Sequence, residues 1–424
     1  MLENYFSPKV IALAGAAEAR LHESFARFER VSEANTAKVL AAFRAERVSE
    51  ACFAGSTGYG YDDLGRATLE RVYARAFGAE SALVRLGFVN GTHAIASALF
   101  AACQPGKTLL AATGSPYDTL LETISGGHGS LRFYGVGYRE VALKFGGSSE
   151  VEHDLVGEPN LPEIKRAAAS NDVCAVLIQR SRGYSPRRAL SVPDIGEIIT
   201  AVRSVNPAAV IVVDNCYGEF TGLEEPTQVG ADLIAGSLIK NPGGGLAPTG
   251  GYVAGKAQLV ERAAERLTVP GIGGECGASL GLNRSFFQGF FMAPHAVCQA
   301  LKTAAFAAAM LESLGLETSP APDAERNDII QTVRFGTKEK LLRFCAGLQR
   351  GAPVDSFVTP EPWAMPGYSD EVVMAAGAFI QGSSIELSCD GPMREPFWGY
   401  MQGGLTYEAG KIGVMTAVEE LLSK

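Results

Sequence analysis

The sequence predicts an α/β fold, with a large domain built on a mostly parallel sheet flanked by helices and a small α+β domain at the C-terminal end. Two observations support this prediction. After about residue 51, short apolar runs alternate with amphipathic stretches, as expected for strands that are covered by helices on both faces. The 424 residues, of which 47% are hydrophobic and 20% charged, suffice to bury a large core and to divide into two domains.

The first part of the chain predicts a helical arm, because apolar residues recur at helical spacing through residues 8–47. The buried strands of the large domain are expected at TLLAA (108–112), VCAVLIQ (173–179), AVIVVD (209–214) and DLIAGSL (232–238). A long helix over 281–315 then leads out of this domain, and Pro294 is expected to kink or restart it near its beginning.

The last hundred residues predict a compact α+β unit. Its strands are expected at QTVRFG (331–336), EVVMAAGAF (371–379) and SSIELS (383–388), and its helices at KEKLLRFCAGLQ (338–349) and TYEAGKIGVMTAVEELL (406–422). The predicted domains are an N-terminal helical arm (1–50), a large domain (51–290), and a connecting helix with the small C-terminal domain (291–424).

Charge and composition argue against several classes of function. The formal net charge of -9, without a basic stripe, does not favour nucleic acid as a partner. The first 25 residues lack the pattern of a secretion signal or a membrane span, so a cytoplasmic location is expected. Eight cysteines are scattered without a CxxC pair or a metal-like cluster, which predicts reduced thiols and no metal site.

An acidic and a basic residue follow two successive apolar runs of the large domain. Asp214 ends AVIVVD, and Lys240 stands two residues beyond DLIAGSL, before a glycine-rich loop. Because the carboxyl ends of parallel strands meet at one edge of a sheet, both side chains are expected to meet one ligand. Pyridoxal phosphate (PLP) requires such a pair: the amine forms a Schiff base, and the carboxylate keeps the pyridine nitrogen protonated. Taken singly, a solvated strand-end lysine and a turn-forming aspartate are the ordinary explanations.

A turn that leads into an apolar helix supplies a candidate phosphate site. Asn90-Gly91-Thr92 precedes HAIASALFAA, so the backbone N–H groups at the start of the helix suit an anion. Gly91 permits close approach, and the hydroxyls of Thr92 and Ser237 add hydrogen bonds. Tyr117, in the loop after the first apolar run, is a candidate to lay its ring against the cofactor. An ordinary helix N-cap and a buried loop tyrosine are the alternatives.

The motifs NGTHAI, GSPYDTL, VVDNCYGEF and GSLIKNPGGGLAPTGGYVAG resemble fold-type I PLP-dependent enzymes of the Cys/Met metabolism group, over nearly the whole chain. More narrowly, GYGYDDLGRATLERVYARAFGAESALVR, IQRSRGYSPRR and GPMREPFWGYMQGGLTYEAGKIG resemble the subfamily labelled methionine gamma-lyase-like or aluminium-resistance protein, which is related to cystathionine beta-lyase. The resemblance implies a fold-type I PLP-dependent transferase-like fold. It also implies a homodimer or homotetramer with active sites at subunit interfaces, and the helical arm is apolar enough to embrace a partner.

The matching motif positions imply a role for each candidate residue. Lys240 would form the Schiff base with PLP, Asp214 would pair with the pyridinium nitrogen, and Tyr117 would stack on the ring. The implied phosphate contacts are Gly91, Thr92 and Ser237.

Two positions depart from the better-characterised lyases of this group. In those lyases a Tyr-x-Arg motif of the neighbouring subunit reaches the phosphate, whereas this chain has Tyr59-Gly60-Tyr61. Tyr59 and Tyr61 are candidates to cross the interface and Arg66 is a candidate substitute for the arginine, with a structural role in the loop as the alternative. Leu238 stands where the group commonly has a hydroxyl residue, which predicts that one phosphate contact is absent.

An amino-acid substrate needs a partner for its carboxylate, and arginine holds a carboxylate best. Arg394, in the turn-rich CDGPMREPF of the small domain, is the first candidate. Arg182 in QRSRGY is the second; it follows a strand of the large domain, and contact with the cofactor is the alternative role for it. A surface salt bridge is the alternative for both. His93 is expected to be structural, because a histidine in such a turn is more often a helix-start or core residue than a catalyst. Cys216 is expected to be a packing residue, because no cationic neighbour that would activate its thiol is recognisable.

The resemblance implies a carbon–sulfur lyase that acts on a sulfur amino acid, cystathionine or methionine-like, by beta or gamma elimination. Lys240 would remove the alpha proton, and the products would be a thiol, a keto acid and ammonia. A PLP-dependent aminotransferase is the first alternative, because PLP supports several reaction types. A PLP-binding stress or regulatory protein with vestigial activity is the second.

Overall fold

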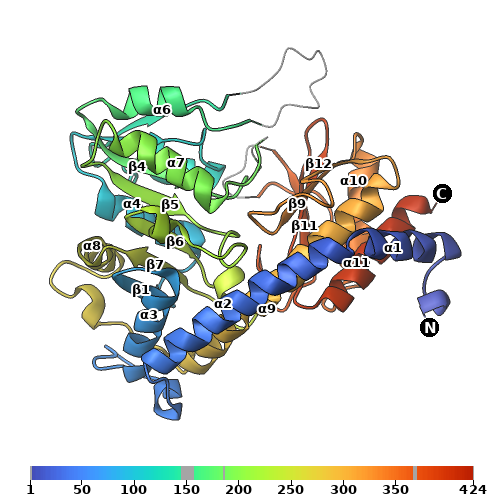
Figure 1. The fold of residues 1–424 in the computed structure, drawn as a ribbon, viewed down its shortest axis with the longest axis horizontal. Helices are drawn as coiled ribbons and strands as arrows, with labels where there is room; N and C mark the ends of the chain where they lie inside the picture. Colours follow the sequence, from blue (N-terminus) through green and yellow to red (C-terminus); the bar gives the residue numbers. More distant parts are fainter. Residues whose placement is uncertain (1, 145–156, 185–186, 366–369, 424) are drawn as a thin grey trace.

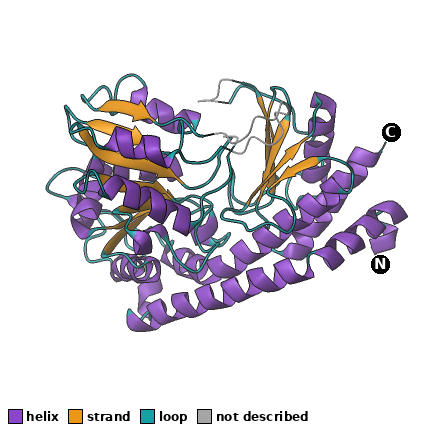
Figure 2. Cartoon of the chain, turned by 45° about the horizontal axis from the view of Figure 1, so that its top comes forward, coloured by secondary structure: helices purple, strands orange, loops and turns teal. Residues whose placement is uncertain are grey.

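The structure is a computed structural model that describes residues 2–144, 157–184, 187–365 and 370–423. Two sheets lie at opposite ends of the molecule, and the long helices α2 and α9 run side by side from one toward the other (Figure 1). Figure 2 shows the same helices as a layer that passes along both sheets.

The larger sheet has seven strands in the order β1-β7-β6-β5-β4-β2-β3. The strands are β1 (Ser81–Arg85), β2 (Thr108–Ala111), β3 (Gly137–Glu140), β4 (Val173–Gln179), β5 (Val210–Asp214), β6 (Leu233–Ser237) and β7 (Gly251–Gly255). The pairs from β6 through β5, β4 and β2 to β3 are parallel, whereas β7 pairs antiparallel with both β6 and β1. This arrangement places the ends of β5 and β6, with the residues that follow them, next to each other.

Helices connect and cover these strands. They are α3 (Leu64–Phe77), α4 (Gly91–Ala102), α5 (Asp118–Ser125), α6 (Leu161–Ala168), α7 (Val192–Arg203) and α8 (Ala257–Leu267), with the 3-10 turns η2 (Glu50–Phe53), η4 (Pro226–Val229), η5 (Asn241–Gly243) and η6 (Gly273–Glu275). Their ends are fixed by local signals in the sequence. Ser191 and Asp194 form a capping box at α7, and α3 ends at Gly78 in the left-handed conformation that glycine adopts readily.

The smaller sheet has five antiparallel strands in the order β10-β11-β12-β9-β8. The strands are β8 (Glu317–Ser319), β9 (Ile330–Arg334), β10 (Val372–Ala375), β11 (Ser388–Pro392) and β12 (Trp398–Gln402), and the helices are α10 (Lys338–Arg350) and α11 (Tyr407–Leu422). The strand predicted at 383–388 is wrong, because the strand begins only at Ser388. The backbone of Ile385 bonds instead to Ile239 and Gly404, so this segment joins the two domains.

The predicted N-terminal helix is two helices, α1 (Pro8–Arg20) and α2 (His22–Ala45), which follow the short turn η1 (Leu2–Asn4) and are separated at Leu21. α2 packs along α9 (Asn283–Glu312), and α1 contacts α9 and α11. Pro294 lies inside α9 without ending the helix, and its carbonyl accepts a hydrogen bond from the Ser32 hydroxyl at 3.1 Å. The arm therefore packs on its own chain.

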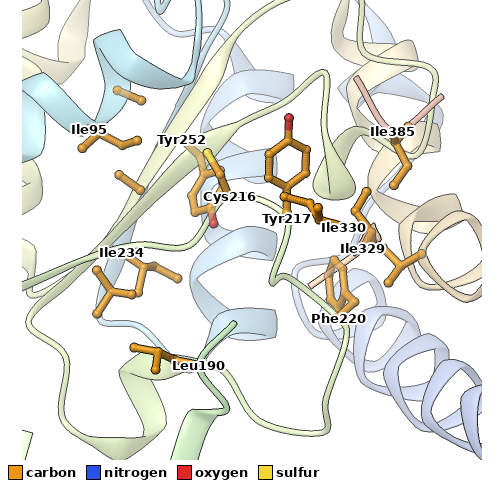
Figure 3. Packing of buried hydrophobic residues seen from close by; sticks show 14 of the residues in the cluster. Ile95, Leu190, Cys216, Tyr217, Phe220, Ile234, Tyr252, Ile329, Ile330 and Ile385 are labelled. Carbon is orange, nitrogen blue, oxygen red and sulfur yellow. The ribbon is translucent and has the colours of Figure 1, made fainter. Parts of the chain in front are cut away.

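One hydrophobic cluster extends through both sheets. In Figure 3, Cys216 and Tyr252 of the larger domain lie in the same cluster as Ile329, Ile330 and Ile385 of the smaller one, with Tyr217 in the middle of the view. A mostly parallel α/β domain with a smaller C-terminal sheet domain is thus confirmed. Within the described ranges, no helix is long and apolar enough to cross a membrane.

Candidate active site

Lys240 lies between the two sheets, where the chain turns after β6 into η5. It is half-buried, and its Nζ lies 3.4 Å from the centroid of the Tyr217 ring, a close cation–π contact. Burial alone would lower the pKa of Lys240, but Tyr217, Cys216 and Asp214 together raise it. The amine is thus held among groups that favour its positive form.

Asp214 ends β5, and its side chain is buried. Its Oδ1 accepts a hydrogen bond from the backbone N–H of Cys216 at 3.1 Å. Burial raises the pKa of Asp214, and the Cys216 N–H and the charge of Lys240 oppose this rise. A buried carboxylate of this kind needs a cation to stay ionised, and a protonated pyridine nitrogen is such a cation.

The start of α4 lies against the end of β6. A Cβ on Gly91 would stand 3.0 Å from the Cβ of Ser237 and 3.3 Å from the Sγ of Cys216, so these three residues are in close contact. The Asn90 side chain caps α4 by accepting a hydrogen bond from the His93 N–H at 2.8 Å.

Two further hydroxyl groups meet at the same place. The Oγ1 of Thr92 lies 3.2 Å from the hydroxyl of Tyr117, which precedes α5. The structure therefore brings Thr92 and Tyr117 together at the start of the helix where Gly91 meets Ser237.

These groups fit the parts of PLP. Gly91 leaves room at the start of α4, where backbone N–H groups face outward, and the hydroxyls of Thr92 and Ser237 suit a phosphate. The carboxylate of Asp214 and the amine of Lys240 suit the pyridine nitrogen and the aldehyde, respectively. Among the described residues, no cluster of His, Cys, Asp and Glu side chains suits a metal ion.

Arg182 joins the two sheets. It is buried, and its guanidinium donates hydrogen bonds to the Oγ1 of Thr332 at 2.8 Å and the Oγ of Ser319 at 3.0 Å, both in the small domain. Residues 185–186 of the motif that contains Arg182 lie outside the described residues. Two donors of Arg182 are thus already used by the protein.

Arg394 lies at the surface of the small domain. Its side chain is 53% exposed, and its Nη1 lies 3.2 Å from the Oδ2 of Asp370. The charges of Arg394 and Arg182 both lower the pKa of Tyr400, which burial raises. The charges of both arginines that the sequence singles out therefore affect the pKa of the same tyrosine.

Tyr59 and Tyr61 stack on each other, with ring centroids 5.5 Å apart, and both are largely exposed. The guanidinium of Arg66 is buried and donates to the carbonyl oxygens of Gly60 and Gly277. Arg66 therefore fixes this loop within its own subunit. A cavity of about 420 Å³ beside the loop is lined in part by Arg66 and His93, so it connects the loop to the first turn of α4.

Sequence reasoning missed Tyr217 and Asp390. Tyr217 covers Lys240 with its ring and donates a hydrogen bond from its hydroxyl to the Ser383 carbonyl at 3.4 Å. Its position after Asp214 in DNCYGEF was the available signal. Burial raises the pKa of Asp390, in β11, to about 6. No local pattern marks Asp390 as a site residue, because it lies in CDGPMREPF, a sequence rich in turn formers.

A comparison with protein-family models matches residues 10–422 to the family described as methionine gamma-lyase. The chain belongs to the methionine gamma-lyase family. The predicted membership of the fold-type I PLP-dependent Cys/Met metabolism group is thereby confirmed. Membership implies PLP as the cofactor and supports a PLP-dependent carbon–sulfur lyase.

Relatives of this methionine gamma-lyase family member cover almost its full length. The uncharacterized protein YnbB of Bacillus subtilis is 50% identical over 93% of this chain and 92% of its own. A carbon–sulfur lyase involved in aluminium resistance from Clostridium novyi is 48% identical, with a TM-score of 0.93 over 99% of this chain and 98% of that chain. The PLP-dependent protein YhfS of Escherichia coli is 17% identical, with a TM-score of 0.59 over 92% of this chain and 95% of that chain, and shares the fold.

Proposed function

We propose that the protein cleaves the carbon–sulfur bond of a sulfur amino acid, cystathionine or methionine-like, by beta or gamma elimination with PLP. The observation that carries this proposal is the convergence of Lys240, Asp214 and the start of α4 in a member of the methionine gamma-lyase family. A carbon–sulfur lyase among the relatives that cover the whole chain supports it.

We assign the cofactor contacts as follows. Lys240 would bind PLP covalently, Asp214 would hold a proton at the pyridine nitrogen, and the ring of Tyr117 would stack on the cofactor. PLP, when bound, accepts the electrons that are released at the substrate alpha carbon. The proposed phosphate contacts are Gly91, Thr92 and Ser237 of the same subunit, with Tyr59 and Tyr61 reaching the cofactor from a second subunit of a homodimer or homotetramer.

The chain's own residues would perform the proton transfers. The Nζ of Lys240 would remove the proton from the substrate alpha carbon. The ring of Tyr217 stays at 3.4 Å in the present geometry and limits where Nζ can point. The same amine can then return its proton as the thiol leaves. Arg394 and Arg182 are the proposed partners of substrate carboxylate groups.

We propose a role for each of the domains predicted from the sequence. The large domain, 51–290, would hold the cofactor, while the segment 291–424 would supply the wall that faces the substrate. The arm, 1–50, packs along α9 and braces the two.

An absorbance scan with borohydride tests the cofactor and the lysine together. Purified wild-type protein should show a visible band that borohydride removes, and Lys240→Ala should lack the band that borohydride traps. The absence of a band in wild type, even after PLP is added, would overturn the proposal.

Product analysis then separates elimination from the aminotransferase alternative. Cystathionine, methionine and cysteine would be added in turn, and ammonia and keto acid measured. Release of ammonia with keto acid from one of them is expected. Conversion of the cofactor to its amine form without ammonia would instead identify an aminotransferase, and no change with any of them would favour the binding-protein alternative.

A further inference from the structure

Asp390, in β11 of the smaller sheet, has one carboxylate oxygen that no described group uses as a hydrogen-bond acceptor. The residue is 7% exposed. Its Oδ2 accepts hydrogen bonds from the hydroxyls of Tyr184 at 3.3 Å and Ser383 at 3.5 Å. Its Oδ1 is buried and has no hydrogen-bond partner in the part of the chain that the structure describes. A buried carboxylate oxygen without a donor is costly, so a donor from a ligand would be favourable here.

A short chain of contacts links Asp390 to Lys240. Ser383, which donates to Asp390, accepts a hydrogen bond at its carbonyl from Tyr217, and the ring of Tyr217 lies under the Lys240 amine. Two residues beyond Ser383, the backbone N–H of Ile385 donates to the carbonyl of the residue before Lys240 at 3.0 Å. The carboxylate is therefore fixed next to the place where the substrate alpha carbon would react.

The charge of Asp390 suits a cation. Burial raises its pKa to about 6, against opposing effects of Tyr184, Lys240 and Ser383, so the carboxyl group is mostly ionised at neutral pH. The rings of Tyr184 and Tyr400 lie beside it, with centroids 4.6 Å apart. A carboxylate bordered by aromatic rings is a favourable site for an ammonium group.

Two positive charges also lie near Tyr400 of this aromatic pair. Arg182 and Arg394 both act on Tyr400, as their effects on its pKa show. A ligand that carries an ammonium and a carboxylate on one carbon would thus find an anion and two cations within one region. An uncharged side chain, such as a methyl thioether, would leave the Oδ1 of Asp390 without a donor.

We propose that Asp390 binds a second ammonium group of the substrate, carried by the part that leaves with the sulfur. The inference rests on the proposed lyase function and deepens it: the preferred substrates are thioethers with an amino acid at both ends, such as cystathionine, rather than methionine-like compounds. The first amino group of the substrate would be engaged with PLP beside Lys240, so it would not be available to Asp390.

Two ligands without sulfur test this assignment by binding alone. 2,7-Diaminosuberate has the length of cystathionine with a methylene in place of sulfur, and 2-aminosuberate lacks the second amine. Neither contains a carbon–sulfur bond, so neither can undergo the proposed elimination. Isothermal titration calorimetry on the PLP-loaded wild type should show at least tenfold tighter binding of the diamino compound. This comparison needs no variant.

Two variants then test whether Asp390 causes the preference for the diamino compound. Asp390→Asn keeps the shape of the side chain and should bind both ligands with equal affinity, while 2-aminosuberate binds as to wild type. Asp355→Asn is the matched control, because it removes an exposed carboxylate of the same domain and should keep the preference. The absorbance band of bound PLP and the melting temperature report whether each variant is folded.

Each other outcome overturns the assignment. Equal affinities in a PLP-loaded wild type would exclude a site for the second ammonium while leaving the lyase function in place. An equal loss of affinity for both ligands in Asp390→Asn would show that Asp390 acts on Lys240 instead. A wild type that takes up no PLP would overturn the proposed function, and this inference with it.

Discussion

Glu219 is a buried acid whose titration should be visible in the stability of the whole protein. Burial raises its pKa to about 8, with Glu225 adding to the rise and the Glu219 backbone N–H, Tyr252 and Arg180 opposing it. The unfolded chain loses this proton near pH 4.5, the ordinary value for glutamate. Between these two values the folded protein holds a proton that the unfolded chain has released, so stability falls as the pH rises.

The size of the effect follows from the two pKa values. A difference of roughly 3.5 pH units at about 1.4 kcal/mol each gives a loss on the order of 5 kcal/mol between pH 4.5 and pH 8. Glu219→Gln removes the titration but keeps an acceptor for the hydroxyl of Tyr252, which bonds to Oε1 of Glu219 at 2.9 Å. The variant should therefore gain stability relative to wild type as the pH rises.

Urea unfolding at half-unit steps from pH 5 to pH 8.5, with PLP present throughout, measures this difference. The new amide adds a cost that does not depend on pH, because the Oε2 of Glu219 has no partner in the described structure. The pH dependence of the difference is thus the quantity to compare. Glu224→Gln changes an exposed neighbour, so its free energy of unfolding should depend on pH in the same way as that of wild type. If the free energy of unfolding of Glu219→Gln had the same pH dependence as that of wild type, Glu219 would be ionised in the folded protein and the reasoning would be refuted.

Four further variants test individual contacts. Gly91→Ala places a Cβ 3.0 Å from the Cβ of Ser237, so the apoprotein should bind PLP at least tenfold more weakly in an absorbance titration; unchanged affinity would remove Gly91 from the phosphate site. Asp214→Asn should keep the fold but shift the absorbance of bound PLP and lower kcat, since the amide does not stabilise a protonated pyridine; a wild-type spectrum and kcat would contradict that role. Arg182→Lys loses the two guanidinium hydrogen bonds that join the segment after β4 to the small domain, and it should lower the free energy of unfolding in urea by about 2 kcal/mol. Arg394→Lys, at the surface, should lower it by less than about 0.5 kcal/mol. Equal losses of stability would contradict the difference in burial.

The sequence was sufficient for elements whose signal is local. The run VCAVLIQ predicted β4 over the residues where it occurs, because a fully buried parallel strand is apolar on both faces. The order of Asp214 and Lys240 after successive runs predicted that they would approach each other, since both follow neighbouring parallel strands.

Signals that depend on distant parts of the chain were invisible in the sequence. The segment SSIELS has the composition of a strand, yet its backbone bonds to Ile239 and Gly404, which no local pattern encodes. Arg182 was recognised as a strand-end arginine, but its partner Thr332 lies 150 positions away. Asp390 sits in a sequence rich in turn formers and becomes notable only because the fold carries it to Lys240.

The pairing of α2 with α9 limits how the two halves of the molecule can move. α9 is continuous from Asn283 to Glu312 and packs along α2, so bending of this helix is one way in which the angle between the sheets can change. Pro294 provides no N–H to the preceding turn, which makes it the natural bending point. The hydroxyl of Ser32, in α2, donates a hydrogen bond to the Pro294 carbonyl and so ties this turn of α9 to α2. Opening and closing around a substrate would therefore be a small flexure centred on one turn of helix, with the N-terminal arm setting its stiffness.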